Sequence, residues 1–370
     1  LGRVAAEDVY AAFDNPPFDR SPLDGYTFAA ASTADASAEH PVRLTVVGEE
    51  CAGDFFAGTV GAGACVRIMT GGAIPAGCDC VVRQEDVREE GDAIFVPFTS
   101  QPFENYCYAG EDIKKDTLLL AKGQRIRASQ IAVLASEGHA DVCVHRRVRI
   151  AVASTGDELL QPGEPLRPGK IYNSNLYLLA GRLKELGAEV TVVGSVPDAV
   201  ERAAEVIASY ADRVDLFLTS GGVSVGKKDI MHGVVPALGA ERLFWRVCMK
   251  PGAPAIAYTR GRMLGIALSG NPFAAYATFE LMARPAIARL AGETDVLMPR
   301  RRAVLADAFP KPCHGRRFLR ARMEADGRVS LPDQHASGSL FSAAGCDAFV
   351  DVPAGTPPLA AGTAVDVVIL

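Results

Sequence analysis

The sequence predicts a multidomain α/β plus β protein: a central, mostly parallel α/β sheet flanked by small β domains and a C-terminal β barrel. Three observations predict this. From Arg147 onward, strands alternate with helices, which is the pattern of βαβ units. Residues 40–100 and 301–370 instead hold short β-like runs separated by Gly and Pro. The 370 residues are too many for one typical core and suggest two to four domains.

The N-terminal third is predicted to be mostly β structure. The runs VRLTVVGEE, GACVRIMTGG, CDCVVRQEDV and AIFVPF indicate a small β domain between residues 40 and 100. Residues 101–147 carry AGEDIKKDTLLLAKGQRI and then a short helical stretch, ASQIAVLASEG. The tail from Arg301 to Leu370 again alternates short strands with Gly and Pro turns, so we expect a small barrel or sandwich there.

The central region is predicted to alternate strands and helices in a fixed order. A run that is apolar throughout indicates a buried strand, and a Gly after an amphipathic run indicates a helix end. The expected elements are a strand at Val148–Thr155, a helix at Ser174–Gly187, a strand at Ala188–Val196, a helix from Asp198 to about Ala211 with Asp198 as its N-cap, a strand at Asp215–Ser220 and a long closing helix at Phe273–Gly292.

Composition excludes some classes of protein. The formal net charge is −6 without a long basic run, which argues against a nucleic-acid partner. No apolar run reaches the roughly 20 residues that span a bilayer, so no membrane partner is expected. No signal peptide is visible at Leu1, and the nine Cys are scattered, which together favour a reducing cytoplasm.

Acidic side chains follow the predicted central strands. Thr155, Asp157 and Glu158 come directly after the first strand, Asp198 follows another, and Asp229 closes the loop after Asp215–Ser220. In such sheets ligands bind beyond the C-terminal ends of the strands. Carboxylates gathered there suit Mg²⁺, which binds one or two of them together with phosphate oxygens. The alternative is that Asp198 is only an N-cap and Glu158 only a solvated side chain.

Three glycine-containing loops point to an anionic ligand at the same edge. Glycine lets another group approach the backbone closely, and N–H groups at a helix start favour anions. An ordinary strand-to-helix turn is the competing interpretation. The loops are SGGVSVGKKD, with Gly221, Gly222, Ser224 and Gly226; CMKPGAP, with Lys250 and Gly252; and LSGNPFAA, with Gly270, Asn271 and Pro272.

These segments resemble the MoeA family, the molybdopterin molybdenumtransferases, which includes the gephyrin E domain. STGDEL, TSGGVSVGKKD, MKPGAP and LSGNP occur in the family's order and spacing. PPFDRSPLDGYTF resembles its S-x-x-D-G-Y segment, and RIMTGGAIPAGCDCVVRQED its T-G-x-x-x-P-x-G-x-D-x-V-V-x-x-E segment. GEDI, HGRRFLR and HASGSLFS also fit, so the resemblance covers nearly the whole chain.

The resemblance implies a reaction and an assembly. Adenylylated molybdopterin and molybdate would give molybdenum cofactor and AMP, with Mg²⁺, in a cytoplasmic homodimer. A MogA-type adenylyltransferase and apo-molybdoenzymes are the implied partners. The implied domains are an elongated dimerisation domain at 1–24 and 101–147, a small β domain at 25–100, a MogA-like molybdopterin-binding domain at 148–294 and a β barrel at 295–370.

The resemblance also implies roles for individual residues. Asp198 and Asp229 match metal-binding acids, Glu158 an essential acid next to the pterin, and Gly221, Gly222 and Ser224 a loop that holds the pterin or its phosphate. Lys250 matches a substrate-binding Lys, and Arg246 stands where many members have a second Lys. Arg316, Ser337 and Ser339 resemble an anion site for molybdate. Asp24, Thr70 and Asp112 match polar positions that face the partner subunit's cleft.

The sequence differs from the family motifs at two places, and two alternative functions stay open. Ala253 replaces the second Lys of the family's K-P-G-K-P, and S-P-L-D-G-Y-T replaces S-A-M-D-G-Y-A. A gephyrin-like scaffold without catalysis would keep the same motifs, and a MogA-type molybdopterin adenylyltransferase would share the central domain. Molybdate and tungstate are tetrahedral dianions of nearly equal size, so the sequence leaves the choice between them open.

Overall fold

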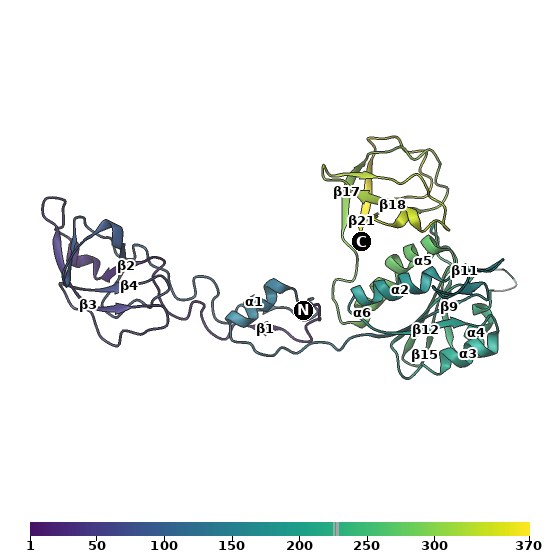
Figure 1. Cartoon of the computed structure of the whole chain (residues 1–370), viewed down its shortest axis with the longest axis horizontal. Coiled ribbons are helices and arrows are strands. Elements are labelled where there is room, and N and C mark those ends of the chain that lie inside the picture. The colour runs from purple at the N-terminus through teal and green to yellow at the C-terminus, as the bar shows by residue number, and fades with distance from the viewer. Residues whose placement is uncertain (225, 227–228) are drawn as a thin grey trace. The chain divides into compact units, whose positions relative to one another are not determined.

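A computed structural model describes residues 1–224, 226 and 229–370 (Figure 1). The chain forms two compact units. The first comprises Leu1, Glu7–Ala121 and Ile126–Val142, and the second comprises Gly2–Ala6, Lys122–Arg125 and Cys143–Leu370. None of the helices in the described ranges is long and apolar enough to cross a membrane.

The first unit is built around a six-stranded sheet with the strand order β5-β2-β4-β3-β7-β6. Its inner face packs Tyr26, Phe28, Leu44 and Ile94 into one core, as expected from the short apolar runs. The strands are β2 (Gly25–Phe28), β3 (Val42–Glu50), β4 (Ala64–Ile68), β5 (Cys80–Arg83), β6 (Arg88–Glu90) and β7 (Ala93–Val96).

Outside that sheet the first unit holds a two-stranded pair and a helix. β1 (Val9–Tyr10) pairs with β8 (Leu118–Leu120), and α1 (Ala128–Ser136) coincides with the predicted helical stretch. The division of the chain into four domains, with a dimerisation role for 1–24 and 101–147, stays a prediction.

The second unit contains the predicted central sheet, with the strand order β12-β9-β13-β16-β15-β14. The first four strands in this order are parallel, and β15 and β14 are added in antiparallel fashion. The strands are β9 (Arg149–Thr155), β12 (Glu189–Val196), β13 (Leu216–Ser220), β14 (Glu241–Trp245), β15 (Ile256–Arg260) and β16 (Met263–Leu268). A short parallel pair, β10 (Leu159–Leu160) and β11 (Ile171–Tyr172), lies outside it.

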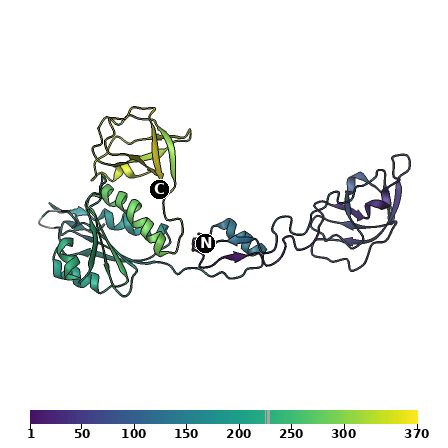
Figure 2. The same cartoon turned by 180° about the vertical axis from the view of Figure 1, so that it is seen from behind.

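Helices cover both faces of this sheet, as Figures 1 and 2 show from opposite sides. α2 (Ser174–Glu185) and the helical run that ends in α6 (Arg284–Leu290) bury Leu179, Leu183 and Phe279 against one face. α3 (Val200–Ala208) and α4 (Met231–Ala237) bury Ile207 and Val234 against the other. Because both faces are covered, β9 and β13 are buried along nearly their whole length, and their runs of apolar residues made them recognisable as buried strands.

Two predictions about these helices were wrong in detail. Asp198 is not an N-cap, because α3 begins at Val200 and Ala199 occupies the cap position. The closing helix is not uniform: α5 (Pro272–Thr278) passes through a π-helical segment (Phe279–Ala283) into α6. Pro285 has no N–H to donate, and in a regular α-helix its ring would clash with a carbonyl one turn earlier. The wider π-helical segment immediately precedes Pro285, where a regular helix would be disrupted.

The C-terminal strands close into a barrel in the order β17-β19-β18-β20-β21, which decides between the barrel and the sandwich. Its interior holds Leu305, Leu319, Val350 and Val367. The strands are β17 (Arg300–Leu305), β18 (Arg317–Met323), β19 (Arg328–Ser330), β20 (Ala348–Val352) and β21 (Ala364–Ile369). Closure leaves no free sheet edge, and loops rather than strand edges are available to a ligand.

Candidate functional site

A cavity of about 1570 Å³ lies within the second unit, where the loops after the parallel strands meet loops of the barrel. It exceeds the 300–1,000 Å³ or so of ordinary small-molecule sites, so it suits a large ligand. The predicted site residues on its lining are Thr155, Glu158, Asp198, Gly221, Gly222, Ser224, Asp229, Lys250, Gly252, Gly270, Asn271, Pro272 and Ser337.

The two glycines after β13 are required by the backbone. Gly221 and Gly222 have φ of 102° and 68°, a region that side chains rarely adopt. A Cβ on Gly221 would also lie 2.6 Å from both the carbonyl oxygen and Oγ1 of Thr155. The loop after β13 therefore lies directly against Thr155 at the end of β9. Only glycine at position 221 leaves enough space for this close approach.

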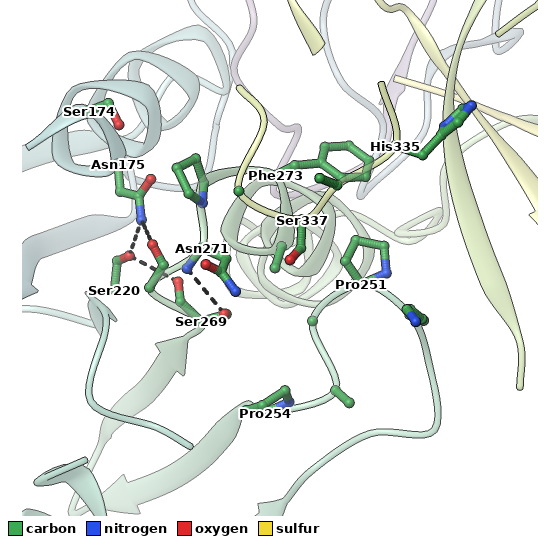
Figure 3. A pocket seen from close by; sticks show the side chains of 18 of the residues that line it. Ser174, Asn175, Ser220, Pro251, Pro254, Ser269, Asn271, Phe273, His335 and Ser337 are labelled. Carbon is green, nitrogen blue, oxygen red and sulfur yellow. Dashed lines mark hydrogen bonds between the residues drawn. The ribbon is translucent and has the colours of Figure 1, made fainter. Parts of the chain in front are cut away.

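A network of buried hydrogen bonds supports the cavity floor (Figure 3). Asn175 Nδ2 donates to Ser220 Oγ at 2.7 Å and to the Gly270 carbonyl at 2.8 Å. Ser220 Oγ donates to the Ser269 carbonyl at 3.1 Å. Asn175, which sequence reasoning missed, thus joins α2 to the loops after β13 and β16. Its signal was an Asn at the start of a predicted helix within IYNSN.

Three of the four predicted carboxylates line the cavity: Glu158, Asp198 and Asp229. Asp157 does not, although its backbone N–H donates to Asp198 Oδ2 at 3.2 Å. Asp229 accepts a hydrogen bond from the N–H of Gly226. No group of three His, Cys, Asp or Glu within the described ranges is close enough to hold a metal ion. A divalent cation here would therefore rely on one or two carboxylates and on ligand oxygens, which is the manner of Mg²⁺.

The loop that carries Lys250 is pinned to the barrel. The Lys250 N–H donates to the Arg316 carbonyl and the Phe318 N–H to the Lys250 carbonyl, each at 2.9 Å. Two residues on, Gly252 has φ of 92°, and a Cβ there would lie 2.3 Å from Thr278 Cγ2 of α5. These contacts fix the backbone, while Lys250 itself reaches the cavity lining.

Arg246 is not among the residues that line the cavity. Its guanidinium lies 5.5 Å from the ring centroid of Trp245. The structure therefore does not support a second cationic ligand at that position, and Lys250 supplies the positive charge on this side of the cavity.

Of the three residues predicted to form the anion site on the barrel, one lies on the cavity lining. Arg316 donates two hydrogen bonds to Asp351, at 2.8 and 2.6 Å, and is absent from the cavity lining. Burial alone would raise the pKa of Asp351, but the hydrogen bonds from Arg316 and Arg300 outweigh it and hold that pKa below its usual value. Ser337 does line the cavity, whereas Ser339 contacts Ser342 at 3.0 Å.

Arg320 holds the serine loop in place. Its fully buried guanidinium donates to the carbonyls of Ala336 and Ser339 and to Ser342 Oγ, and it stacks 3.5 Å from the Phe273 ring centroid. Burial lowers the pKa of Arg320 to about 10, so it stays charged at neutral pH. The sequence had suggested Arg316 of HGRRFLR, but the last Arg of that motif is the one that positions Ser337.

The barrel wall of the cavity includes residues that sequence reasoning missed. Phe309, Arg317 and His335 line it together. The Arg317 guanidinium lies 4.9 Å from the Phe309 ring centroid, and the His335 ring meets Phe309 edge-on at 5.3 Å. Arg317 is therefore the arginine of HGRRFLR that faces the cavity.

His335 makes folding stability depend on pH. Burial first, and then the charges of Arg320, Arg317 and Lys311, lower its pKa from 6.5 to about 4. Between pH 6.5 and pH 4 the His335 side chain binds a proton in the unfolded chain but not in the folded protein. The free energy of unfolding therefore keeps its full contribution from His335 above pH 6.5 and loses it as the pH falls toward 4. We expect His335→Gln to reduce the fall in Tm between pH 7 and pH 4.5. Thermal melts with unchanged pH dependence would contradict this.

The remaining predicted residues belong to the first unit. Asp24 Oδ1 accepts hydrogen bonds from the backbone N–H and the hydroxyl of Thr70, both at 2.7 Å. These bonds lower the pKa of Asp24, so it is ionised at neutral pH. Asp112 is exposed, and its N–H donates to the Asn15 carbonyl at 3.1 Å. The structure joins Asp24 to Thr70, and their approach to any cleft stays a prediction.

Fold and cavity together define a class of protein: an α/β domain with a glycine-lined cavity at the ends of its parallel strands, whose wall is completed by loops of a β barrel. The chain matches three family descriptions in sequence order: "MoeA N-terminal region (domain I and II)" over residues 1–138, "Probable molybdopterin binding domain" over 151–289 and "MoeA C-terminal region (domain IV)" over 302–370. The chain belongs to the MoeA family, as the motifs had indicated.

Known relatives extend over the whole chain. A protein of Bacillus subtilis named molybdopterin molybdenumtransferase is 37% identical over 378 residues, covering 100% of this chain and 88% of its own. One of the same name from Staphylococcus epidermidis is 35% identical, covering 100% and 89%. A crystal structure of a molybdopterin biosynthesis MoeA protein from Pyrococcus horikosii has 32% identity and a TM-score of 0.85, covering 100% of this chain and 92% of that one.

Proposed function

We propose that this protein is a molybdopterin molybdenumtransferase that converts adenylylated molybdopterin and molybdate into molybdenum cofactor and AMP. The observation that carries the proposal is one cavity lined by two glycine loops, Lys250, three carboxylates and a serine loop of the barrel. A substrate with a pterin, a pyrophosphate and an anionic co-substrate needs all of these groups in one place. The name that the relatives carry, molybdopterin molybdenumtransferase, supports the transfer of molybdenum to molybdopterin.

Each group of residues on the cavity lining would bind a different part of the substrate. The N–H groups of the Gly221–Gly222 and Gly270–Asn271 loops and the ammonium of Lys250 bind phosphate oxygens. Glu158 offers carboxylate oxygens to the N–H donors of the pterin. Asp198 and Asp229 would hold Mg²⁺, which as a Lewis acid supplies positive charge against the phosphate that leaves with AMP. The barrel loops exclude water from the pyrophosphate and present the co-substrate anion.

An AMP-release assay with and without molybdate tests the proposal. We expect AMP to form from adenylylated molybdopterin only when molybdate is added. A gephyrin-like scaffold would release none, and a molybdopterin adenylyltransferase would instead consume ATP and release pyrophosphate. The apolar and basic barrel wall formed by Phe309, Arg317 and His335 favours the insertion reaction over adenylyl transfer, because it adds cationic lining to the strand-end site.

For the anion we propose Ser337, Lys250 and Arg317 in place of the set that contained Arg316. All three line the cavity, and Arg supplies a fixed fork of N–H donors suited to oxyanions. Arg317→Ala is expected to raise the molybdate concentration for half-maximal rate by about tenfold to a hundredfold, the loss of one charge-assisted bond or two. Molybdate titrations of AMP release measure this midpoint.

The neighbouring Arg316→Ala is the matched control. Its side chain is engaged with Asp351, so it is expected to lower Tm and leave the molybdate midpoint unchanged. The reverse result, a shifted midpoint in Arg316→Ala and none in Arg317→Ala, would refute the revised site. Repeating the titration with tungstate decides which dianion the site prefers.

A further inference from the structure

The loop after β13 begins with Gly221 and Gly222 and carries Ser224 on the cavity lining. Gly221, Gly222 and Gly226 are free of the steric limits that restrict other residues, so ordering them costs more entropy than ordering any other residue type. Precise placement of a binding loop therefore requires contacts from outside the loop.

Two aromatic side chains supply such contacts on successive carbonyls. Trp245 Nε1–H, at the end of edge strand β14, donates to the Val223 carbonyl at 3.3 Å. His232 Nε2, in the first turn of α4, lies 3.0 Å from the Ser224 carbonyl. Because a carbonyl oxygen only accepts, Nε2 must carry the proton.

The two rings also support each other. Their centroids are 4.7 Å apart with an interplanar angle of 88°, an edge-to-face arrangement. The Arg246 guanidinium lies on Trp245, 5.5 Å from its ring centroid. Arg246, Trp245 and His232 thus form a stacked set that we name the aromatic clamp.

Peptide geometry links the clamp to the ligand side. In a planar trans peptide the carbonyl of one residue and the N–H of the next point in opposite directions. With the Val223 carbonyl held on Trp245, the Ser224 N–H points away from Trp245, and Ser224 is on the cavity lining. Holding the carbonyl therefore sets the direction of a potential donor to a ligand oxygen.

We propose that Trp245 and His232 are positioning residues of the reaction, which orient Ser224 at the cavity by holding the carbonyls of Val223 and Ser224. This inference rests on the proposed function for its kinetic consequence, but not for the contacts themselves. It predicts that either contact can be removed without unfolding the protein and that the loop then loses order.

Hydrogen–deuterium exchange of the unliganded protein tests the clamp independently of activity. Trp245→Phe keeps a ring but removes the donor, and His232→Ala removes the other donor. Both are expected to raise exchange in the peptide that spans residues 216–231. Phe244→Ala is the matched control, because Phe244 is the neighbouring residue of the same strand and is similarly exposed. Exchange in that peptide identical to wild type in both clamp variants overturns the proposal.

Kinetics then test the positioning role. Trp245→Phe and His232→Ala are each expected to lower kcat for AMP release by about threefold to tenfold, the worth of one hydrogen bond, with KM changed less. His232→Gln, which restores a donor, is expected to recover most of the rate, and Phe244→Ala to retain all of it. Looser exchange with an unchanged kcat would refute the positioning role.

Failure of the proposed function gives a different pattern. If the wild-type protein releases no AMP, the proposed transferase function is refuted, and the effect of the clamp on kcat is refuted with it. The difference in hydrogen–deuterium exchange between Trp245→Phe and Phe244→Ala is still observed if the clamp exists. Because Trp245 is the single tryptophan of the chain, its emission spectrum in His232→Ala reports directly on the ring contact. A spectrum identical to that of wild type would count against the contact.

Discussion

Asp229→Asn is expected to lower molybdate-dependent AMP release by at least about a hundredfold, the scale of losing a key electrostatic group at a reacting centre. Asp229 lines the cavity and accepts a hydrogen bond from the Gly226 N–H. Asn keeps an oxygen for that bond, so the loop retains its conformation while the charge disappears. Without the charge, the site loses one of the two carboxylates proposed to hold Mg²⁺ against the substrate phosphates.

The measurement is single-turnover AMP release at saturating molybdate, together with substrate binding by titration. Binding is expected to weaken much less than the rate, because Lys250 and the glycine loops remain. Asp212→Asn serves as the control, since it removes an exposed carboxylate that precedes β13, at the opposite end of the strand from the loop that carries Asp229. Undiminished turnover in Asp229→Asn would remove Asp229 from the metal site.

An inactive Asp24→Ala protein mixed with an inactive Asp229→Ala protein is expected to regain activity. We propose a C₂ homodimer in which the first unit of one subunit completes the cavity of the other. When equal amounts are mixed, half of the dimers contain one subunit of each variant. In each of these dimers, one of the two sites is formed by an intact first unit and an intact second unit. The expected recovery is therefore about a quarter of the wild-type rate.

The two units carry formal charges of opposite sign. The first unit has 22 Asp and Glu against 8 Lys and Arg, a formal net charge of −14. The second has 22 against 30, a formal net charge of +8. Units of opposite sign on two copies attract each other, and salt weakens that attraction.

The mixing experiment has two internal checks. Activity should be recovered only after the subunits have had time to dissociate and re-associate, and salt that weakens the dimer should shorten that time. Mixing two proteins that both carry Asp229→Ala should recover none. A strictly monomeric wild-type protein that stays active at nanomolar concentration would exclude the composite site.

Much of the site could be predicted from the sequence because its residues lie in short contiguous motifs that directly follow the predicted strands. Gly221, Gly222 and Gly252 are needed where φ is positive and a Cβ would collide with Thr155 or Thr278, and no other residue meets that condition. Strands such as β9 and β13 carry runs of apolar residues because both faces of the sheet are covered. Their C-terminal ends then had to bring Glu158 and Asp229 to one edge.

Other features depended on contacts between segments far apart in the chain. Trp245 and His232 could not be assigned to the Gly221–Asp229 loop until β14 and α4 were placed beside it. The N-cap at Ala199 rather than Asp198 likewise depends on where α3 packs against β12. Asn175 gained its role only because α2 lies over the loops that follow β13 and β16.

The sequence by itself determined the family, the order of the strands and helices, and the glycine and carboxylate positions at the sheet edge. Only the tertiary structure decided which arginine of HGRRFLR faces the cavity. Successive residues at a strand point to opposite sides, so their directions follow from strand register. Pairing of β18 with β20 sets Arg317 opposite Val352 and leaves Arg316 beside Asp351, and that register arises from barrel closure, which no local pattern in the sequence encodes.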